Sequence, residues 1–365
     1  MKRRALLATF AGSALLPLSP GCATSELPDQ RRELLSSWGH AFLLAQYSEF
    51  EARAAELEAR AAELRDAPSS ETLEAARSAW WTARAPWKRA EVFAFGPYSE
   101  EPQRIGPKID FWPARPETIE GVLEDDFELD PEAIEDLGAP AKGLPALEYL
   151  LYAPDADPVA LFGDPRRGEY VRALAQDLVA RAREIHDAWA PEHENFLNEL
   201  VDAGRSSTRF MNLNAALGEI VNRIGYTLEN DRLEKLAPAL GDTSDGTPQP
   251  DRLESTYSGR SLEDLRDNLA GIEHLYRGDA PSGLRGLDAY LRGRGKNLGR
   301  SFDELALACR NAFDALPGTL AEAVSAEPAA VREVMSRFAA LQRFFQVDVL
   351  NALSLSLGFN DNDGD

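Results

Sequence analysis

The chain has 365 residues, of which 44% are hydrophobic, and its formal net charge is −22. This length suggests about two domains of common size, with enough apolar residues for a buried core. The acidic balance argues against nucleic-acid binding, since phosphate contacts need a basic surface, whereas it suits a protein that attracts cations. Two cysteines and four histidines argue against a disulfide framework and against a metal cage built from several histidines.

Residues 1–21 have the features of an export signal. A basic start (2–4) precedes an apolar stretch, and Cys22 follows a small residue. This arrangement resembles the cleavage site of bacterial lipoproteins and predicts a lipid anchor on Cys22. The paired arginines also resemble a twin-arginine signal, and a plain secretory peptide is the third alternative. Without the leader the formal charge changes from −22 to −25, because three positive charges are lost. No later stretch has the roughly 18 apolar residues of a membrane span.

The first predicted helix covers residues 29–66. Inside it the unit EARAAEL occurs twice in succession, which places Phe50, Leu57 and Leu64 at heptad spacing on one face. We expect this stripe to pack against the rest of the protein. A coiled coil with a partner protein is the alternative.

A second helix is predicted over residues 71–93, and Pro86 is expected to end or kink it near Arg84. One face of this helix mixes aromatic and charged residues: Trp80, Arg84, Trp87 and Glu91. Their spacing of four, three and four residues keeps them in one stripe. The stripe is either an aromatic core edge with a salt bridge or the wall of a polar pocket.

The rest of the chain is also predicted to be helical, and period-2 apolar alternation is almost absent, so no sheet of any size is expected. A proline-rich loop is predicted over 96–118, an acidic turn and short helix over 124–135, and further helices over 142–152, 167–202, 207–237, 261–277, 283–292, 301–324 and 328–356. Residues 237–251 form the best candidate linker. The predicted fold is all-α, with one four-helix-bundle-like half over 22–240 and another over 251–365.

The segment KGLPALEYLLY, residues 142–152, places a carboxylate among leucines. Glu148 shares a helical face with Leu144 and Leu151, so we expect it to be buried. Pro145 is acceptable in the first helical turn, where its missing N–H has no intrahelical partner. A buried carboxylate needs hydrogen bonds or a cation, and Arg84 is the partner we expect for Glu148. Glu148 is then either a structural acid or part of a ligand pocket.

The common catalytic spacings are absent from the chain. There is no H-E-x-x-H zinc helix, no G-x-S-x-G elbow and no glycine-rich phosphate loop. His186 and His193 are seven residues apart on one predicted helix, which suggests either a metal site or, as we expect, a solvated helix face.

Five blocks occur in a characteristic order: AWWTARAPWKRAEVFAFGP, KIDFWP, KGLPALEYLLY, YSGRSLEDLRDNLAGIEHLY and LGFNDNDGD. With them, the chain from about residue 30 to its end resembles the imelysin family. The resemblance implies an all-helical protein of two bundles that is exported to the periplasm or outer membrane and is associated with bacterial iron uptake. The founding member was described as an insulin-cleaving membrane protease, which implies a peptidase as one alternative.

The family signature is G-x-H-x-x-E. Gly143 and Glu148 match it, whereas Pro145 stands where the histidine belongs. The ligand pocket that the resemblance implies comprises residues from the shared blocks: Arg84, Trp87, Glu91, Asp110, Gly143, Pro145, Glu148, Ser258 and Asp264. Because the histidine is missing, we assign no set of metal ligands and expect no catalytic residue. Iron or another divalent cation, weakly held, is the only cofactor that the resemblance leaves open.

The sequence thus predicts an exported, non-catalytic, imelysin-like protein that binds a ligand or a partner in an iron-related system of the envelope. One alternative is a divergent metallopeptidase of the imelysin type. Another is a structural lipoprotein that holds a redox or uptake partner at the membrane. Membrane contact is expected through the lipid anchor alone.

Overall fold

The computed structural model describes residues 26–152 and 157–358. The predicted leader, the lipidation at Cys22 and most of the C-terminal block GFNDNDGD lie outside these residues. Apart from turns and loops, the described part is helical except for a hairpin of two short strands, β1 (Gly278–Asp279) and β2 (Leu284–Arg285). The predicted all-α fold class is therefore confirmed.

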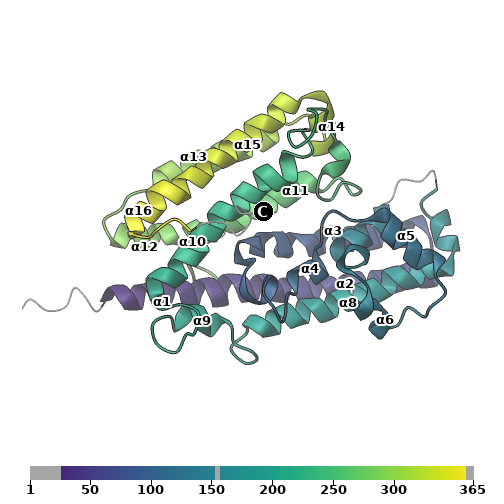
Figure 1. The fold of residues 1–365 in the computed structure, drawn as a ribbon, viewed down its shortest axis with the longest axis horizontal. Helices are drawn as coiled ribbons and strands as arrows, with labels where there is room; N and C mark the ends of the chain where they lie inside the picture. The colour runs from purple at the N-terminus through teal and green to yellow at the C-terminus, as the bar shows by residue number, and fades with distance from the viewer. Residues whose placement is uncertain (1–25, 153–156, 359–365) are drawn as a thin grey trace, which may run out of the picture.

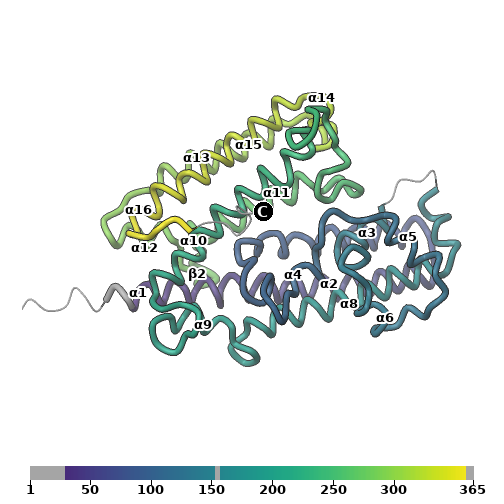
Figure 2. The backbone as a smooth tube through the Cα atoms, in the orientation of Figure 1, coloured from purple at the N-terminus to yellow at the C-terminus, as the bar shows by residue number. Residues whose placement is uncertain are grey.

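The helices form two layers (Figures 1 and 2). In the first layer α2 packs against α3 and α8, and α7 packs on α3 and α8. The elements up to residue 201 are α1 (Glu26–Ser37), η1 (Trp38–Leu43), α2 (Leu44–Asp66), α3 (Ser70–Arg89), η2 (Ala90–Phe93), η3 (Gly96–Tyr98), α4 (Gly106–Ile109), α5 (Pro116–Glu124), α6 (Pro131–Asp136), η4 (Ala139–Ala141), α7 (Gly143–Tyr152), η5 (Ala160–Gly163), α8 (Pro165–Trp189) and α9 (Leu197–Val201).

In the second layer α15 packs against α10 and α13, and α11 packs on α13. Its elements are α10 (Leu213–Asn230), η6 (Asp231–Leu236), η7 (Pro250–Arg252), α11 (Ser261–Arg277), α12 (Leu287–Gly293), α13 (Gly299–Asp314), α14 (Leu320–Ala326), α15 (Pro328–Arg343), η8 (Phe344–Val349) and α16 (Leu350–Leu353). The layers meet where α11 and α10 contact α3 and η2. The domain boundary at 237–251 stays a prediction, although α10, which precedes it, packs on α15, which follows it.

Several predicted helices are interrupted in the structure. The predicted helix 167–202 ends at Trp189, because Pro191 puts residue 190 in an extended conformation, and α9 begins only at Leu197. The predicted helix 301–324 is likewise divided between α13 and α14, and a hairpin precedes α12. The helix predicted over 207–237 begins six residues late, at Leu213, whereas the other long helices match their predictions more closely. Short π-helical turns (η1, η6 and η8) lie within or at the end of three of these helices.

Pro86 does not end its helix, so that part of the prediction is wrong. The α3 helix runs through it to Arg89 and continues as a 3₁₀ turn to Phe93. A proline inside a helix costs about 3 kcal/mol or more. Burial of Trp87 and Lys88, which are 3% and 2% exposed, supplies the compensating packing and polar contacts.

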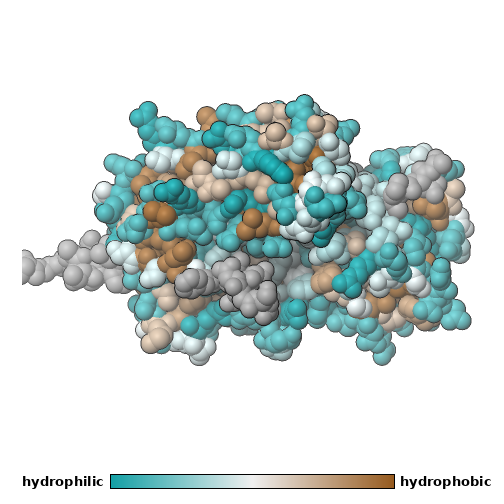
Figure 3. Space-filling model, turned by 45° about the horizontal axis from the view of Figure 1, so that its top comes forward, coloured by the Kyte–Doolittle hydropathy of each residue, from teal (hydrophilic) through white to brown (hydrophobic). Residues whose placement is uncertain are grey.

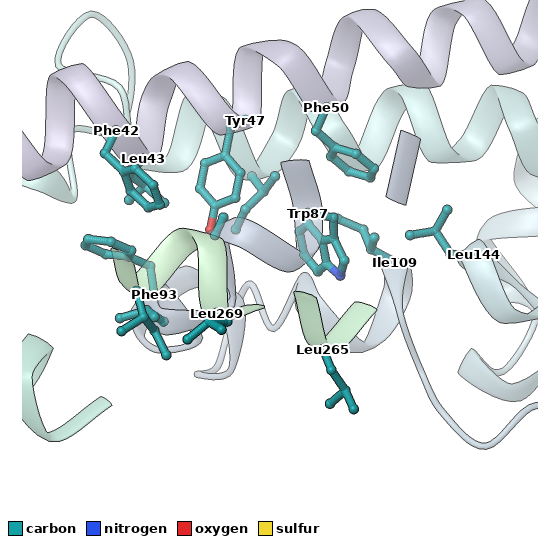
Figure 4. Packing of buried hydrophobic residues seen from close by; sticks show 14 of the residues in the cluster. Phe42, Leu43, Tyr47, Phe50, Trp87, Phe93, Ile109, Leu144, Leu265 and Leu269 are labelled. Carbon is teal, nitrogen blue, oxygen red and sulfur yellow. The ribbon is translucent and has the colours of Figure 1, made fainter. Parts of the chain in front are cut away.

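The heptad stripe of α2 faces the interior of this chain. Leu57 and Leu64 are fully buried, like Phe50, and α2 packs on α3 and α8. Figure 4 shows Phe50 close to Trp87 and Phe42 close to Phe93, with ring centroids 5.2 and 6.1 Å apart. This stripe therefore forms the core between α2 and α3, as we expected, and not a coiled coil with a partner.

The face drawn in Figure 3 is mostly hydrophilic, with scattered hydrophobic residues. Large exposed hydrophobic side chains are few among the described residues, and Met211 is the most exposed of them at 90%. No helix within 26–152 or 157–358 combines the length and the apolar character that a membrane crossing requires.

A glycine sets the distance between the layers. A Cβ atom on Gly271 of α11 would lie 2.1 Å from the carbonyl oxygen of Arg89 at the end of α3. Any side chain there would push the two helices apart, because backbone atoms cannot yield as a flexible side chain can.

We expect Gly271→Ala to lower the free energy of unfolding by about 1–3 kcal/mol, because the methyl group overpacks the contact between α11 and α3. The matched control is Gly218→Ala on α10, where a Cβ would meet no atom within 4 Å. There the change should stabilise by up to about 1 kcal/mol, through helix propensity alone. Urea titrations of both variants test this, and equal effects at the two sites would contradict the steric argument.

Candidate functional site

Nine charged side chains lie together at the interface between the two layers, and most of them are buried. We call this set the interlayer network; it comprises Arg84, Lys88, Glu91, Asp110, Asp231, Lys235, Glu254, Arg260 and Asp264. The first layer supplies the groups from α3, η2 and the end of α4. The second supplies those from η6, α11 and the loop between η7 and α11.

Arg84 lies at the centre of the network and is 1% exposed. Its three guanidinium nitrogens each lie 2.9 Å from a different carboxylate: Nη1 from Asp110, Nη2 from Glu254 and Nε from Asp264. Burial opposes the charge of Arg84, but these acids outweigh it and hold the pKa of the guanidinium well above its usual value. Arg84 therefore stays charged and joins both layers.

Trp87 of α3 and Glu91 of η2 continue the stripe that contains Arg84. The indole Nε1 of Trp87 donates to Asp110 Oδ2 at 3.0 Å, so that Asp110 is held by two side chains of α3. Burial nevertheless raises the pKa of Asp110, against the opposing charge of Arg84. Trp80, at the start of the stripe, donates to the carbonyl oxygen of Leu144 at 2.9 Å and so fastens α7 to α3.

Two lysines neutralise the acids on the other side of Arg84. Lys88 Nζ lies 2.9 Å from Glu254 Oε1, and Lys235 Nζ lies 2.8 Å from both Glu91 Oε1 and Asp231 Oδ1. Burial acts against ionisation of Glu91, but the lysines outweigh it and lower the pKa of Glu91 to about 2.

Asp231 is the least satisfied acid of the network. It is fully buried, and neither of its oxygens receives a well-oriented hydrogen bond from the described residues, despite the ion-pair distance to Lys235. Burial accordingly raises the pKa of Asp231 to about 6.

Glu148 does not pair with Arg84, so that prediction is wrong. Its Oε1 instead accepts hydrogen bonds from the backbone N–H of Ser258 at 2.8 Å and from the Ser258 hydroxyl at 2.7 Å. The hydroxyl oxygen also accepts from the N–H of Arg260, a network residue, at 3.2 Å. The loop before α11 thus supplies the hydrogen-bond donors for Glu148, whereas Arg84 pairs with Asp110, Glu254 and Asp264.

Burial raises the pKa of Glu148 to about 7, and the hydrogen bonds from Ser258 and the charge of Arg84 only partly oppose it. The side chain contacts no cation among the described residues, and the residue is 4% exposed. Glu148 is therefore poised to change its charge near neutral pH, unlike Glu91 beside the lysines.

The start of α7 is shaped by the signature residues. Gly143, the first residue of α7, has φ +73°, and a Cβ there would lie 2.3 Å from the carbonyl oxygen of Ile109, the residue before Asp110. Pro145 is the third residue of α7 and is buried, so its place in the first turn is confirmed. Whether these residues form a ligand pocket stays a prediction.

Sequence reasoning missed Lys88, Asp231, Lys235, Glu254 and Arg260. Lys88 lies four residues after Arg84 and continues the same stripe, and this spacing could have revealed it. Glu254 carries no comparable signal, because it lies in an irregular segment whose path only the tertiary structure defines.

The residues at the signature position do not fit a metal ion. Pro145 has no ligand atom, Glu148 offers a single carboxylate, and the acids nearby already contact Arg84, Lys88 or Lys235. Iron and zinc sites gather several protein ligands. Across the part of the chain that the structure describes, no three His, Cys, Asp or Glu side chains are arranged to hold a metal. His186 and His193 instead lie 3.3 and 3.4 Å from Asp187 Oδ1 at the end of α8.

The pairing of Arg84 can be measured by a double-mutant cycle. We expect Arg84→Met to destabilise the protein by about 3–5 kcal/mol, because it strips buried acids of their countercharge. Combined with Asp264→Asn, the loss should fall short of the sum of the single losses by about 1 kcal/mol or more. Arg53→Met, at an exposed pair on α2, should cost at most about 1 kcal/mol.

Denaturant titrations supply the energies for this cycle, and Arg84→Lys keeps a charge if Arg84→Met does not fold. Strict additivity of the Arg84 and Asp264 changes would show that these two side chains do not interact.

Glu148→Gln should remove a pH dependence of stability. The pKa of Glu148 rises from 4.5 in the unfolded chain to about 7 in the fold, so its burial costs nothing below pH 4.5 and increasingly more as pH rises to 7. The full cost above pH 7 is up to about 3 kcal/mol. The variant should therefore gain stability over the wild type between pH 5 and 8. Urea titrations across that range test this, with exposed Glu124→Gln as control; parallel curves for wild type and Glu148→Gln would refute it.

The sequence and fold have clear relatives. The sequence pattern described as imelysin matches residues 43–343. Iron-regulated protein A of Synechococcus elongatus is 28% identical over 279 residues, which are 75% of this chain and 73% of the relative. Two crystal structures share the fold: an imelysin-like protein from Psychrobacter arcticum (TM-score 0.73, 18% identity, 91% of this chain and 98% of that chain) and a putative iron-regulated protein A precursor from Parabacteroides distasonis (TM-score 0.73, 17% identity, 93% and 97%). With its pattern matched over most of its length, the chain belongs to the imelysin family.

Proposed function

We propose that this protein is an exported, non-catalytic member of the imelysin family that binds a ligand or partner in an iron-related system of the bacterial envelope. In this proposal Cys22 carries a lipid anchor, and the partners are uptake or redox proteins of the envelope. Loss of the protein from the membrane fraction on Cys22→Ala is the direct test of the anchor.

The observation that carries the non-catalytic assignment is the charge balance around Glu148. At the signature position the chain places Pro145, and its own Arg84, Lys88 and Lys235 contact the neighbouring acids at 2.9 Å or less. A metallopeptidase needs a metal ion to activate water, and such an ion would have to displace or repel these side chains. Binding, in contrast, needs no such ion.

The iron-related part of the proposal rests on the relatives. Two of them are named iron-regulated protein A, and one of these is described as a precursor, which accords with the leader before Cys22. The strongly acidic chain would repel anions and attract cationic partners or ligands.

Calorimetric titration with zinc and ferrous iron tests the loss of the metal site. We expect no tight, stoichiometric site in the wild type. Pro145→His restores G-x-H-x-x-E within the first turn of α7, yet only two ligands would then face a metal, so binding should appear weakly and vanish with the added change Glu148→Gln. Helical content by circular dichroism should be unchanged, because histidine is acceptable in that turn.

A peptidase would give the opposite results. Tight metal binding by the wild type that disappears on Glu148→Gln, together with chelator-sensitive cleavage of insulin chains by the pure protein, would overturn the proposal in favour of the metallopeptidase.

A further inference from the structure

A cavity of about 410 Å³ lies between α2, α6 and α8, away from the interlayer network. Its size falls within the range of about 300–1,000 Å³ that is usual for small-molecule sites. The lining combines acids, small apolar side chains and two arginines: Glu58, Pro131, Glu135, Ala173, Gln176, Asp177, Val179, Ala180, Arg181 and Arg183.

Asp177 of α8 is a buried acid with an unused acceptor. Its side chain is 7% exposed, and Oδ2 is buried and receives no hydrogen bond from the described residues. Oδ1 lies 3.3 Å from Arg181 Nε, a contact that is not a well-oriented hydrogen bond. Burial raises the pKa of Asp177, and the charges of Arg181 and Lys142 only partly offset it. A buried carboxylate oxygen without a donor is costly, so a donor brought by a ligand would stabilise it.

The cations near Asp177 are engaged elsewhere. Arg181 Nη2 pairs with Glu135 at 3.1 Å, and its Nη1 pairs with Glu184. Buried Lys142 donates to the carbonyl oxygens of Ile134 and Glu135 at 3.2 and 2.8 Å, at the end of α6. Neither cation donates a hydrogen bond to Asp177 Oδ2 in the described structure, and two of their contacts, Arg181 with Glu135 and Lys142 with the carbonyl oxygens, fasten α6.

Glu58 of α2 offers a second free carboxylate on the same cavity. It forms no ion pair or hydrogen bond with the described residues, and it is partly buried. The wall also includes apolar side chains, namely Pro131, Ala173, Val179 and Ala180. Two carboxylates on a partly apolar cavity match a molecule with two ammonium groups joined by methylene groups.

We propose that this cavity binds a short aliphatic polyamine, with one ammonium group on Asp177 Oδ2 and a second on Glu58. The methylene stem packs against the apolar wall, which contributes the hydrophobic part of the affinity. Both charged contacts are of the charge-assisted kind, which is stronger than a neutral hydrogen bond.

The surroundings favour the capture of such a cation. Residues 117–136, which include α6 at the cavity rim, contain ten acids and no lysine or arginine. Acids gathered around a cavity raise the local concentration of cations and speed their association. This acidic segment cannot by itself distinguish ligands, so the specificity of the site rests on Asp177 and Glu58.

Calorimetric titration of the mature protein with putrescine and butylamine tests the site. Putrescine should bind one to one and about tenfold more tightly than butylamine, because only the diamine reaches both carboxylates. Asp177→Asn should weaken both ligands about tenfold. Glu58→Gln should weaken putrescine alone and bring it to the affinity of butylamine.

Two further variants keep the test decisive. Asp136→Asn removes an exposed acid of α6 that does not line the cavity, and it should leave both affinities unchanged. Ala180→Leu narrows the cavity without changing any charge, and it should weaken the binding of both ligands. This variant tests the site independently if Asp177→Asn folds poorly. Equal weakening by Asp136→Asn and Asp177→Asn would reveal diffuse attraction to an acidic protein and overturn the site, as would the absence of putrescine binding.

Discussion

The contact of one guanidinium group with three buried carboxylates governs how this protein is assembled. Arg84 binds Asp110 from its own layer and Glu254 and Asp264 from the other, each at 2.9 Å. Removing four cations and five acids from water is costly, and only good geometry repays that cost. The network therefore defines one relative position of the two layers, since a shift would leave buried charges unpaired.

The same network explains why neighbouring acids differ in chemistry. Glu91 and Glu254 contact lysine ammonium groups, and these charges outweigh burial and lower the pKa of both carboxyls. Glu148 contacts no cation directly within the described part of the chain, and the hydrogen bonds from Ser258 and the more distant charge of Arg84 do not outweigh burial, so its pKa rises. Glu91 and Glu254 each contact two or more cations closely. Burial still prevails where cations are fewer or farther away: among the described residues Asp231 contacts Lys235 alone, and of the two cations near Asp110, Lys88 lies 3.9 Å away, so the pKa of both acids is raised. The histidine of the family signature would have stood three residues before Glu148, the acid whose pKa is closest to neutral pH.

The sequence predicted the helical class and most long helices, because apolar periodicity over many residues is a strong signal. The spacing in α3 and the shared blocks also identified seven residues that lie in the interlayer network or beside it. They are Arg84, Trp87, Glu91, Asp110, Glu148, Ser258 and Asp264. The partner of Glu148 was not predictable. Ser258 and Asp264 lie in one block, but which of them meets Glu148 and which meets Arg84 depends on the path of the loop before α11. The breaks at Pro191 and before α14 were missed because apolar spacing resumes after each turn.

The absent side chain at Gly271 has an electrical consequence as well as a steric one. It lets α11 approach α3 until a Cβ would lie 2.1 Å from the Arg89 carbonyl oxygen, and Arg84 and Asp264, which form one ion pair of the network, lie on these same two helices. The attraction between opposite charges falls with distance and falls much more steeply once water enters between them. A single hydrogen atom in place of a methyl group thus maintains the low local permittivity in which these charges hold the layers together.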